Sequence, residues 1–328
     1  MAFTSAAWKT FVLQITGADH IARWVDVQRL WSGYGQIIRC HLVGADRQTV
    51  IVKHVKWPST QSHPRGWTTD RSHARKAKSY QVESVWYRDF APRCTAGCRV
   101  PQCLGLNHEG DEVVMVMEDL DASGFNGRQN RLTEADLAAC LRWLAEFHGT
   151  FMHVAPTGLW QTGTYWHLAT RPDELAVLRK RLPALAEAAS EIDQRLNASP
   201  FKTLVHGDAK VANFCFSTVQ TAVAAVDFQY VGGGCGMKDL AYLMSSCLDE
   251  AECQAREDEM LSLYFMHLRT VLARQVSSID ADALEADWRA LYPFAWADFY
   301  RFLEGWSPGH WKSHGYTRRI TEQVLANL

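Results

Sequence analysis

The stretch HGDAKVANF, residues 206–214, decides how the rest of this 328-residue chain is interpreted. It places an acid at Asp208, a lysine at Lys210 and an amide at Asn213 within one short loop. An isolated acid near an amide is most often part of a turn, because short polar side chains hydrogen-bond the neighbouring backbone. The surroundings of the loop therefore decide between a turn and a functional site.

Two short apolar runs flank the loop and predict a strand on each side of it. FKTLVHG (201–207) leads into the loop, and AVAAVDFQ (222–229) follows it and contains a second acid, Asp227. This layout indicates a phosphotransferase site, because moving a γ-phosphoryl group needs an acid that orients the acceptor hydroxyl and hard oxygen ligands for Mg²⁺. We expect Asp208 in the first role, and Asn213 with Asp227 in the second.

The composition is that of a globular enzyme with a sizeable core. Hydrophobic residues make up 47% of the chain and charged residues 21%, and the length predicts two domains or lobes. With 34 basic and 36 acidic residues, the formal net charge is −2, which provides no long-range field to attract nucleic acid or an anionic membrane. We expect a small-molecule ligand and no nucleic-acid partner.

Targeting and redox features predict a cytoplasmic location. The start, MAFTSAAWKTFVLQITGADH, lacks the basic segment and long apolar run of a signal peptide, and no later window reaches the roughly 18 uncharged apolar residues of a membrane span. The nine cysteines form an odd set, which favours reduced thiols. Cys94, Cys98 and Cys103 lack the short C-x-x-C spacing of a zinc site, so we expect no metal there.

The first third of the chain predicts strands with one helix. Residues 36–55 contain two β-branched runs joined by the turn-prone sequence at 44–46, which predicts a hairpin with Lys53 in its second strand. The continuous apolar run VVMVMEDL (113–120) predicts a buried strand. Between them, the spacing of apolar residues in 72–92 predicts an amphipathic helix that ends before Pro92.

The remainder of the chain is predicted to be mainly helical. TEADLAACLRWLAEFHGTF (133–151) begins with an N-cap threonine, has acids in its first turn and carries apolar residues at helical spacing. The region from 236 to the end shows helical spacing again. Its acidic run at 248–259 is typical of a solvated helix face, with attraction of a cationic acceptor as the alternative.

The motifs together resemble those of the small-molecule kinases that include aminoglycoside phosphotransferases and choline kinases. HGD (206–208) is combined with Asn213, then with DFQ (227–229) and DLA (239–241). Within this superfamily the chain is most similar to the ecdysteroid-kinase-like (CHK kinase-like) group, and the resemblance extends from about Gln28 through nearly the whole chain.

The resemblance implies an α+β, bilobal, protein-kinase-like fold. A small antiparallel-sheet lobe with one helix, residues 1–118, would bind the nucleotide. A larger, mainly helical lobe, residues 119–328, would carry the catalytic loop and the acceptor pocket. The expected cofactors are ATP and Mg²⁺.

The resemblance also implies roles for residues of the catalytic loop. Asp208 matches the catalytic acid, while Asn213 and Asp227 match the metal ligands. Lys210 projects from the same loop and can meet the γ-phosphate as charge shifts in the transition state.

On the nucleotide side, the resemblance places Lys53 on the α- and β-phosphates, held by the helix carboxylate of Glu83. The glycine-rich loop corresponds to SGYG (32–35), with Gly33 and Gly35 near the phosphates.

The segment MEDL (117–120) resembles the hinge of this fold. There, the Glu118 carbonyl and the Leu120 N–H would bind adenine through backbone atoms.

The acceptor pocket is expected among aromatic residues of the C-terminal region. Trp306, Trp311 and Tyr316 are the candidates, and the alternative lies around Trp160 and Tyr165. Core packing is the competing interpretation of these rings.

We therefore expect ATP- and Mg²⁺-dependent phosphorylation of a hydroxyl group on a small molecule. A non-catalytic nucleotide-binding pseudokinase is disfavoured, because Lys53, Asp208, Asn213 and Asp227 are all present. A protein kinase is disfavoured, because only 12 positions separate Asp227 from Asp239, which leaves little room for an activation segment.

Overall fold

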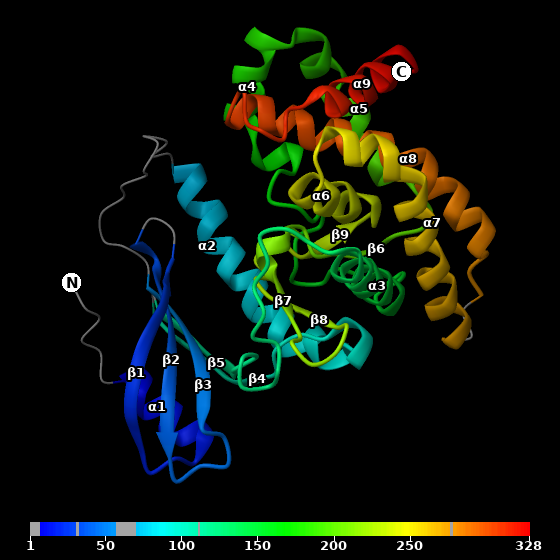
Figure 1. The fold of residues 1–328 in the computed structure, drawn as a ribbon. Helices are drawn as coiled ribbons and strands as arrows, with labels where there is room; N and C mark the ends of the chain where they lie inside the picture. Colours follow the sequence, from blue (N-terminus) through cyan, green and yellow to red (C-terminus); the bar gives the residue numbers. More distant parts are fainter. Residues whose placement is uncertain (1–6, 31–32, 57–69, 111, 276–277) are drawn as a thin grey trace. The chain divides into compact units, whose positions relative to one another are not determined.

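The computed structural model describes most of the chain, namely residues 7–30, 33–56, 70–110, 112–275 and 278–328. The chain divides into two compact units, which we call unit 1 and unit 2 (Figure 1). Unit 1 comprises Met1–Arg93 with Val100–Gly127, and unit 2 comprises Cys94–Arg99 with Arg128–Leu328. The expected lobe boundary after residue 118 stays a prediction.

Unit 1 contains one antiparallel sheet with the strand order β1-β2-β3-β5-β4 (Figure 1). The strands are β1 (His20–Arg29), β2 (Gly35–Val43), β3 (Thr49–Lys56), β4 (Cys103–Glu109) and β5 (Glu112–Glu118). The predicted hairpin of residues 36–55 and the predicted buried strand near 113–120 are both confirmed. Lys53 lies in the central strand β3, opposite Ile37 of β2 and Met115 of β5.

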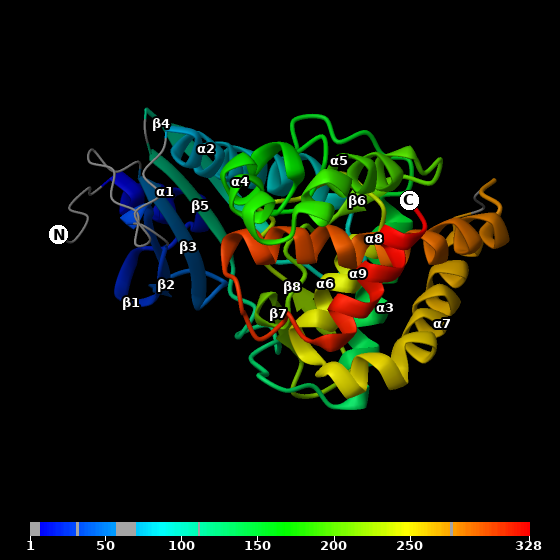
Figure 2. The same ribbon diagram turned by 90° about the horizontal axis from the view of Figure 1, so that it is seen from above.

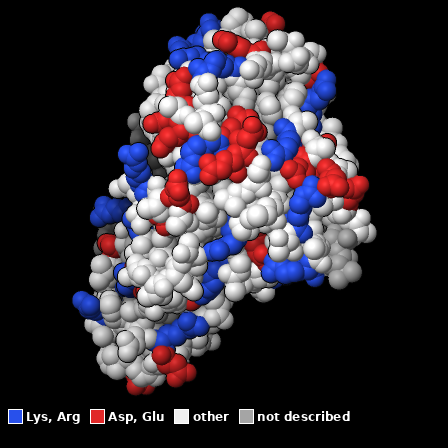
Figure 3. Space-filling view, turned by 45° about the vertical axis from the view of Figure 1, so that its right-hand side comes forward, with Lys and Arg blue, Asp and Glu red and all other residues white. Residues whose placement is uncertain are grey.

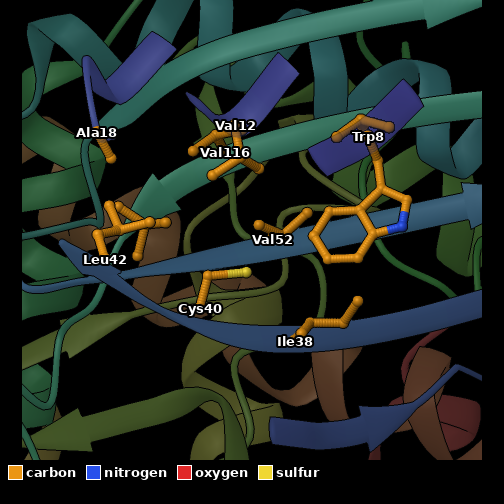
Figure 4. Packing of buried hydrophobic residues seen from close by; sticks show 10 residues of the cluster. Trp8, Val12, Ala18, Ile38, Cys40, Leu42, Val52 and Val116 are labelled. Atoms are coloured by element: carbon orange, nitrogen blue, oxygen red, sulfur yellow. The ribbon is translucent and has the colours of Figure 1, made fainter. Parts of the chain in front are cut away.

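A second helix of unit 1, α1 (Ala7–Thr16), supplies part of the core of the sheet. Trp8 and Val12 lie one turn apart and pack with Ile38, Cys40 and other strand residues (Figure 4). The sequence predicted only one helix in this third of the chain. A ten-residue helix is marginal by itself and is stabilised by this packing, which its local sequence does not reveal.

The predicted helix of unit 1 is α2 (Asp70–Val85), but the chain does not stop winding there. It continues as a π-helical segment, η2 (Trp86–Phe90), and a 3₁₀ turn, η3 (Ala91–Arg93). The α-helix ends before Pro92, as predicted, but the π-helical segment and the 3₁₀ turn carry the chain through Pro92. Glu83 lies in the last turn of α2.

Unit 2 is mainly helical, as predicted. Its α-helices within the described ranges are α3 (Glu134–Thr150), α4 (Pro172–Arg181), α5 (Pro183–Ala198), α6 (Met237–Cys247), α7 (Glu250–Arg274), α8 (Ala281–Trp306) and α9 (Gly315–Ala326). The predicted N-cap at Thr133 is confirmed, because its side chain accepts a hydrogen bond from the Asp136 N–H. Helix α8 packs against α4, α6 and α9 (Figure 2).

Two small sheets hold the loop that carries HGDAKVANF. Strand β6 (Thr203–Val205) pairs with β9 (Gly232–Gly234), and β7 (Phe214–Phe216) pairs with β8 (Val223–Ala225). The two strands predicted beside the loop are therefore β6 and β8, and each pairs with a different partner. The loop ends in one 3₁₀ turn, η6 (Val211–Asn213).

The surface carries both signs of charge. On the face drawn in Figure 3, Lys and Arg side chains lie interspersed with Asp and Glu side chains. None of the helices within the described ranges combines the length and apolar character needed to cross a membrane.

Candidate active site

A buried carboxylate from α6 holds the start of the catalytic loop. Asp239 Oδ2 accepts a hydrogen bond from the His206 N–H at 2.6 Å, and Oδ1 accepts one from the Gly207 N–H at 2.9 Å. Oδ2 also lies 3.1 Å from Nε2 of His148, whose Nδ1 lies 2.7 Å from the Tyr264 hydroxyl. Two successive backbone N–H groups are thereby fixed to a helix, which positions the next residue, Asp208.

The histidine and glycine before Asp208 shape the loop backbone. His206 Nδ1 accepts a hydrogen bond from the Asp208 N–H at 3.2 Å, and its Nε2 lies 3.1 Å from the Val226 carbonyl. Gly207 has φ +79°, and a Cβ at this position would lie 2.2 Å from the Tyr230 carbonyl oxygen. Any other residue would place its Cβ against this carbonyl in an unfavourable backbone conformation, so the turn requires glycine.

The two carboxylate oxygens of Asp208 have different surroundings. Oδ2 accepts hydrogen bonds from Lys210 Nζ and Asn213 Nδ2, both at 2.9 Å. Oδ1 is buried and has no hydrogen-bond partner among the residues that the structure describes. One oxygen is thus anchored, while the other keeps its capacity to accept a hydrogen bond.

The ammonium of Lys210 remains charged beside this carboxylate. Burial lowers the pKa of Lys210, but the negative charges of Asp208 and Asp227, together with the hydrogen bond to Asp208, outweigh it and hold the pKa above its ordinary value. The pair therefore presents an anchored cation and an anchored anion at one site.

Asn213 lies next to Asp208, and Asp227 lies near enough for its charge to act on Lys210. Asn213 Nδ2 also donates to the Asp208 carbonyl at 2.7 Å, so the amide turns its nitrogen toward Asp208 and keeps Oδ1 as an acceptor. The Val226 N–H donates to the Asn213 carbonyl at 3.0 Å, which ties the residue before Asp227 to the loop. Asp227 adopts φ +69°, a left-handed conformation that is uncommon outside glycine and is enriched at functional sites.

These two residues fit a magnesium ion that has few protein ligands. Carboxylate and amide oxygens suit Mg²⁺, which commonly keeps water and phosphate oxygens in its remaining positions. Across the described ranges, no group of three or more His, Cys, Asp and Glu side chains is arranged to hold a metal. A cation at Asn213 and Asp227 would therefore depend on oxygens of a bound phosphate.

In unit 1, the structure brings Lys53 and Glu83 together. Lys53 Nζ lies 2.7 Å from both carboxylate oxygens of Glu83, and both side chains are almost fully buried. The Tyr80 ring, one turn before Glu83 on α2, lies 5.6 Å from the ammonium. A buried cation with two carboxylate contacts is held in one position by strand and helix together.

The turn that precedes β2 needs glycine at a defined place. Gly35 has φ +143°, and a Cβ there would lie 2.0 Å from the His54 carbonyl oxygen of the neighbouring strand. Gly33 also has a positive φ, +76°. Ser32, the first residue of the SGYG stretch, lies outside the described residues.

Of the two expected hinge residues, Glu118 is the last residue of β5 and Leu120 follows it. The side chain of Glu118 accepts hydrogen bonds from the Gln102 N–H at 3.0 Å and the Ser123 hydroxyl at 2.6 Å. Nothing in the described part of the chain accepts a hydrogen bond from the Leu120 N–H. The side chain of Glu118 thus fixes the segment, whereas the Leu120 N–H remains available.

The three aromatic candidates for the acceptor pocket do not form one cluster. Trp306 stacks on Phe302 with ring centres 5.7 Å apart. Trp311 has 61% of its surface exposed, whereas Tyr316 is buried and donates a hydrogen bond to Glu257. Tyr316 thus packs among helices, while Trp306 ends α8 and Trp311 lies in the segment between α8 and α9.

Two tyrosines lie next to Asp208. The Tyr165 N–H donates to the Gly207 carbonyl at 3.1 Å, and the ring centres of Tyr165 and Tyr242 are 5.5 Å apart. Burial raises the pKa of each phenol, and the nearby charge of Asp208 raises it further. Trp160, named with Tyr165 in the alternative pocket, donates its indole N–H to a loop carbonyl and is buried.

The sequence did not single out Tyr242. A usable signal existed, because Tyr242 follows Asp239 by three positions on α6 and so shares a helix face with the residue that holds the catalytic loop. The position of Lys312, considered below, had no such local signal.

Comparisons with known proteins identify the family. Residues 48–158 and 166–276 match the ecdysteroid kinase-like family. No curated protein matches the sequence. Among solved structures, the amicoumacin kinase hAmiN is similar over 100% of this chain and 96% of that chain, with 14% identity and a TM-score of 0.52.

A microcompartment-associated aminopropanol kinase is similar over 98% of this chain and 94% of its own, with 14% identity and a TM-score of 0.50. At this level of identity the likeness concerns the fold, and it confirms the predicted protein-kinase-like α+β class. The family match covers more than half of the chain, and it confirms the prediction of a small-molecule kinase. The chain belongs to the ecdysteroid kinase-like family.

Proposed function

We propose that the protein transfers the γ-phosphoryl group of ATP to a hydroxyl group of a small molecule, with Mg²⁺ as the metal. The arrangement at Asp208 is the observation that carries this proposal. Its Oδ2 is held by Lys210 and Asn213, while the buried Oδ1, which has no donor among the described residues, would receive a hydrogen bond from an acceptor hydroxyl.

Asp208 orients the acceptor oxygen for attack and takes its proton. A bond forms between the acceptor oxygen and the γ-phosphorus while the bond from that phosphorus to the β–γ bridging oxygen breaks. ADP then leaves, and the hydroxyl proton resides on Asp208 until solvent removes it. Lys210 places positive charge beside the carboxylate and near the transferred group, where charge shifts during the reaction.

Asn213 Oδ1 and the Asp227 carboxylate would hold the magnesium ion. When bound, the ion neutralises phosphate charge and fixes the orientation of the γ-phosphoryl group. The amicoumacin kinase hAmiN was solved in complex with AMP-PNP and Ca²⁺, which supports nucleotide and divalent-metal use in this fold.

Residues of unit 1 would hold the nucleotide. Lys53 would bind the α- and β-phosphates with its ammonium fixed by Glu83. Gly33 and Gly35 would allow the backbone to approach the phosphates, and the hinge backbone after β5 would bind adenine. We also propose a cytoplasmic location, which the nine free thiols support.

The test is ADP release with MgATP against hydroxylated metabolites, sterols, amino alcohols, aminoglycosides and peptides. We expect at least one small hydroxylated compound to stimulate ADP release, and Asp208→Asn to reduce kcat by roughly 10²-fold or more. Asp258→Asn, an exposed acid on α7, is the matched control and should retain full activity. Full activity in Asp208→Asn would overturn the proposed mechanism, and stimulation by peptides alone would favour a protein kinase.

A further inference from the structure

A buried lysine lies among aromatic rings in unit 2. Lys312, in the segment between α8 and α9, has 8% of its surface exposed. Its Nζ lies 4.5 Å from the ring centre of Tyr242, 5.5 Å from that of Trp311 and 5.6 Å from that of Phe299. Tyr242 is the tyrosine of α6 beside Asp208, so this ammonium belongs to the surroundings of the catalytic loop.

No described carboxylate forms an ion pair with Lys312. The two other buried lysines in the described ranges face acids: Lys53 lies 2.7 Å from Glu83, and Lys238 lies 3.9 Å from Asp298. For Lys312, burial lowers the pKa to about 8, Asp208 raises it and Lys210 lowers it. The nearby catalytic carboxylate therefore offsets only part of the effect of burial.

The backbone on both sides of this lysine is fixed. The Lys312 N–H donates to His310 Nδ1 at 3.2 Å, and the Lys312 carbonyl accepts from the Thr317 hydroxyl at 3.1 Å. Thr317 is fully buried in the first turns of α9. The ammonium is thus presented from an anchored segment, which limits the conformational freedom lost when it binds a ligand.

A purely structural role does not account for the charge. The ammonium lies near the Tyr242 and Phe299 rings, but an unbranched apolar side chain would fill this place without burying a charge. Aromatic faces compensate a buried cation only in part, and burial lowers the pKa of this ammonium. A negatively charged ligand group would compensate it more fully, and the exposed Trp311 ring beside it can stack on a flat ligand.

The acidic run of α7 gives no support to a cationic acceptor. Glu250 lies 2.9 Å from Arg319, and Glu259 lies 3.2 Å from Arg256, so these acids have basic partners on the helix surface. This agrees with the predicted solvated face.

We propose that Lys312 binds an anionic group of the acceptor, so that the protein selects hydroxyl-bearing acids with a flat apolar body over amino alcohols. This inference rests on the proposed kinase function. It adds the class of acceptor and a specificity-determining residue, while Asp208 remains the group that contacts the reacting hydroxyl.

The test uses three probes with one ring system and one hydroxyl: 6-hydroxymethyl-2-naphthoate, the corresponding carboxamide, and the corresponding aminomethyl compound. Their Kd values are measured calorimetrically at pH 7 on the full chain, and ADP release is measured separately with MgATP. We expect wild type to bind the carboxylate at least tenfold more tightly than the amide, and the ammonium compound most weakly.

The variants isolate the charge of Lys312. Lys312→Met should bind the carboxylate and the amide equally, and its Kd for the amide should differ less than twofold from that of wild type. Lys312→Arg should keep part of the preference for the carboxylate. Lys202→Met, at an exposed lysine of the same unit, is the matched control and should behave as wild type.

A melting experiment separates this role from a structural one. The pKa of Lys312 is lower in the folded protein than in the unfolded chain, so its charge opposes folding below about pH 8, and this effect diminishes as the pH rises toward its ordinary pKa. Lys312→Met should therefore melt at a higher temperature than wild type at pH 7, with a smaller difference at pH 9.5.

Three results would overturn the inference: equal binding of carboxylate and amide by wild type, no carboxylate binding, or a preference that survives Lys312→Met. A lower melting temperature of Lys312→Met at pH 7 would assign the lysine a structural role instead. If the carboxylate preference holds but none of the proposed panel stimulates ADP release, the anion site stands and the kinase proposal fails.

Discussion

At the scale of the residue, three buried lysines illustrate how the same side chain serves different purposes. Lys53 is matched by a carboxylate with two short contacts, and Lys238 by a more distant one. Lys312 has aromatic neighbours instead. Burying an ammonium is unfavourable unless a partner compensates its charge. The neighbours of each buried lysine therefore indicate which group its charge serves to bind.

The Lys53–Glu83 pair provides a prediction about function and stability together. Lys53→Met and Glu83→Gln each leave one buried ionic group without its partner, so each should lower the free energy of unfolding by about 3 kcal/mol in urea titrations. Lys53→Met should also lose most turnover, because the ammonium holds the phosphates in a reactive position.

The double variant Lys53→Met/Glu83→Leu should regain most of the stability, because two apolar side chains then face each other, and it should remain inactive. Wild-type turnover in Lys53→Met would show that another group binds the phosphates. If the double variant is as inactive as the single variants and also recovers no stability, the substitutions have damaged the fold.

At the scale of the element, the sequence predicted those segments whose pattern is local. The hairpin of β2 and β3, the buried strand β5 and the capped helix α3 each carry their signal within their own residues. Helix α1 was missed, since its stability depends on contacts with distant strands. The flanking strands β6 and β8 were predicted; β8 pairs with β7, which lies close to it in the sequence, whereas the pairing of β6 with β9 joins segments on opposite sides of the loop.

The same distinction applies to the candidate site. Asp208, Lys210 and Asn213 lie within one contiguous motif, so their proximity was predictable from the sequence. Lys312 has neighbours from α6, from α8 and from its own segment, and no local pattern brings these together. The contacts within the loop were therefore accessible to sequence analysis, whereas the surroundings of Lys312 required the structure.

The attachment of the catalytic loop to α6 can be tested by Asp239→Asn. An amide offers one oxygen and one NH₂ group, so one of the two backbone N–H groups at His206 and Gly207 would face another donor. We expect a loss of about 1–3 kcal/mol in the free energy of unfolding and a lower kcat with a nearly unchanged KM for MgATP. Unchanged stability together with full activity would exclude this carboxylate as the support of the loop; Asp258→Asn serves again as the control.

At the scale of the whole molecule, ligand binding and folding are linked. A ligand that binds only the folded protein stabilises it by an amount that depends on its concentration relative to Kd, about 2.7 kcal/mol at 100 times Kd. The melting temperature of the full chain therefore reports nucleotide binding independently of turnover. This measurement can therefore distinguish the role of Asp208 from that of Asp227, which lies after the end of β8.

Asp208→Asn and Asp227→Asn should differ in this measurement although both lose turnover. Asp208 contacts the acceptor hydroxyl in the proposed mechanism, so its variant should gain as much thermal stability from MgATP as wild type does. Asp227 supplies an anionic ligand to a magnesium ion that has few protein contacts, so its variant should gain little more from MgATP than from ATP with EDTA. Melting curves with ATP, with and without Mg²⁺, distinguish these outcomes. An equal loss of the MgATP-dependent shift in both variants would contradict the division of roles, because the acceptor-side acid would then also hold the nucleotide.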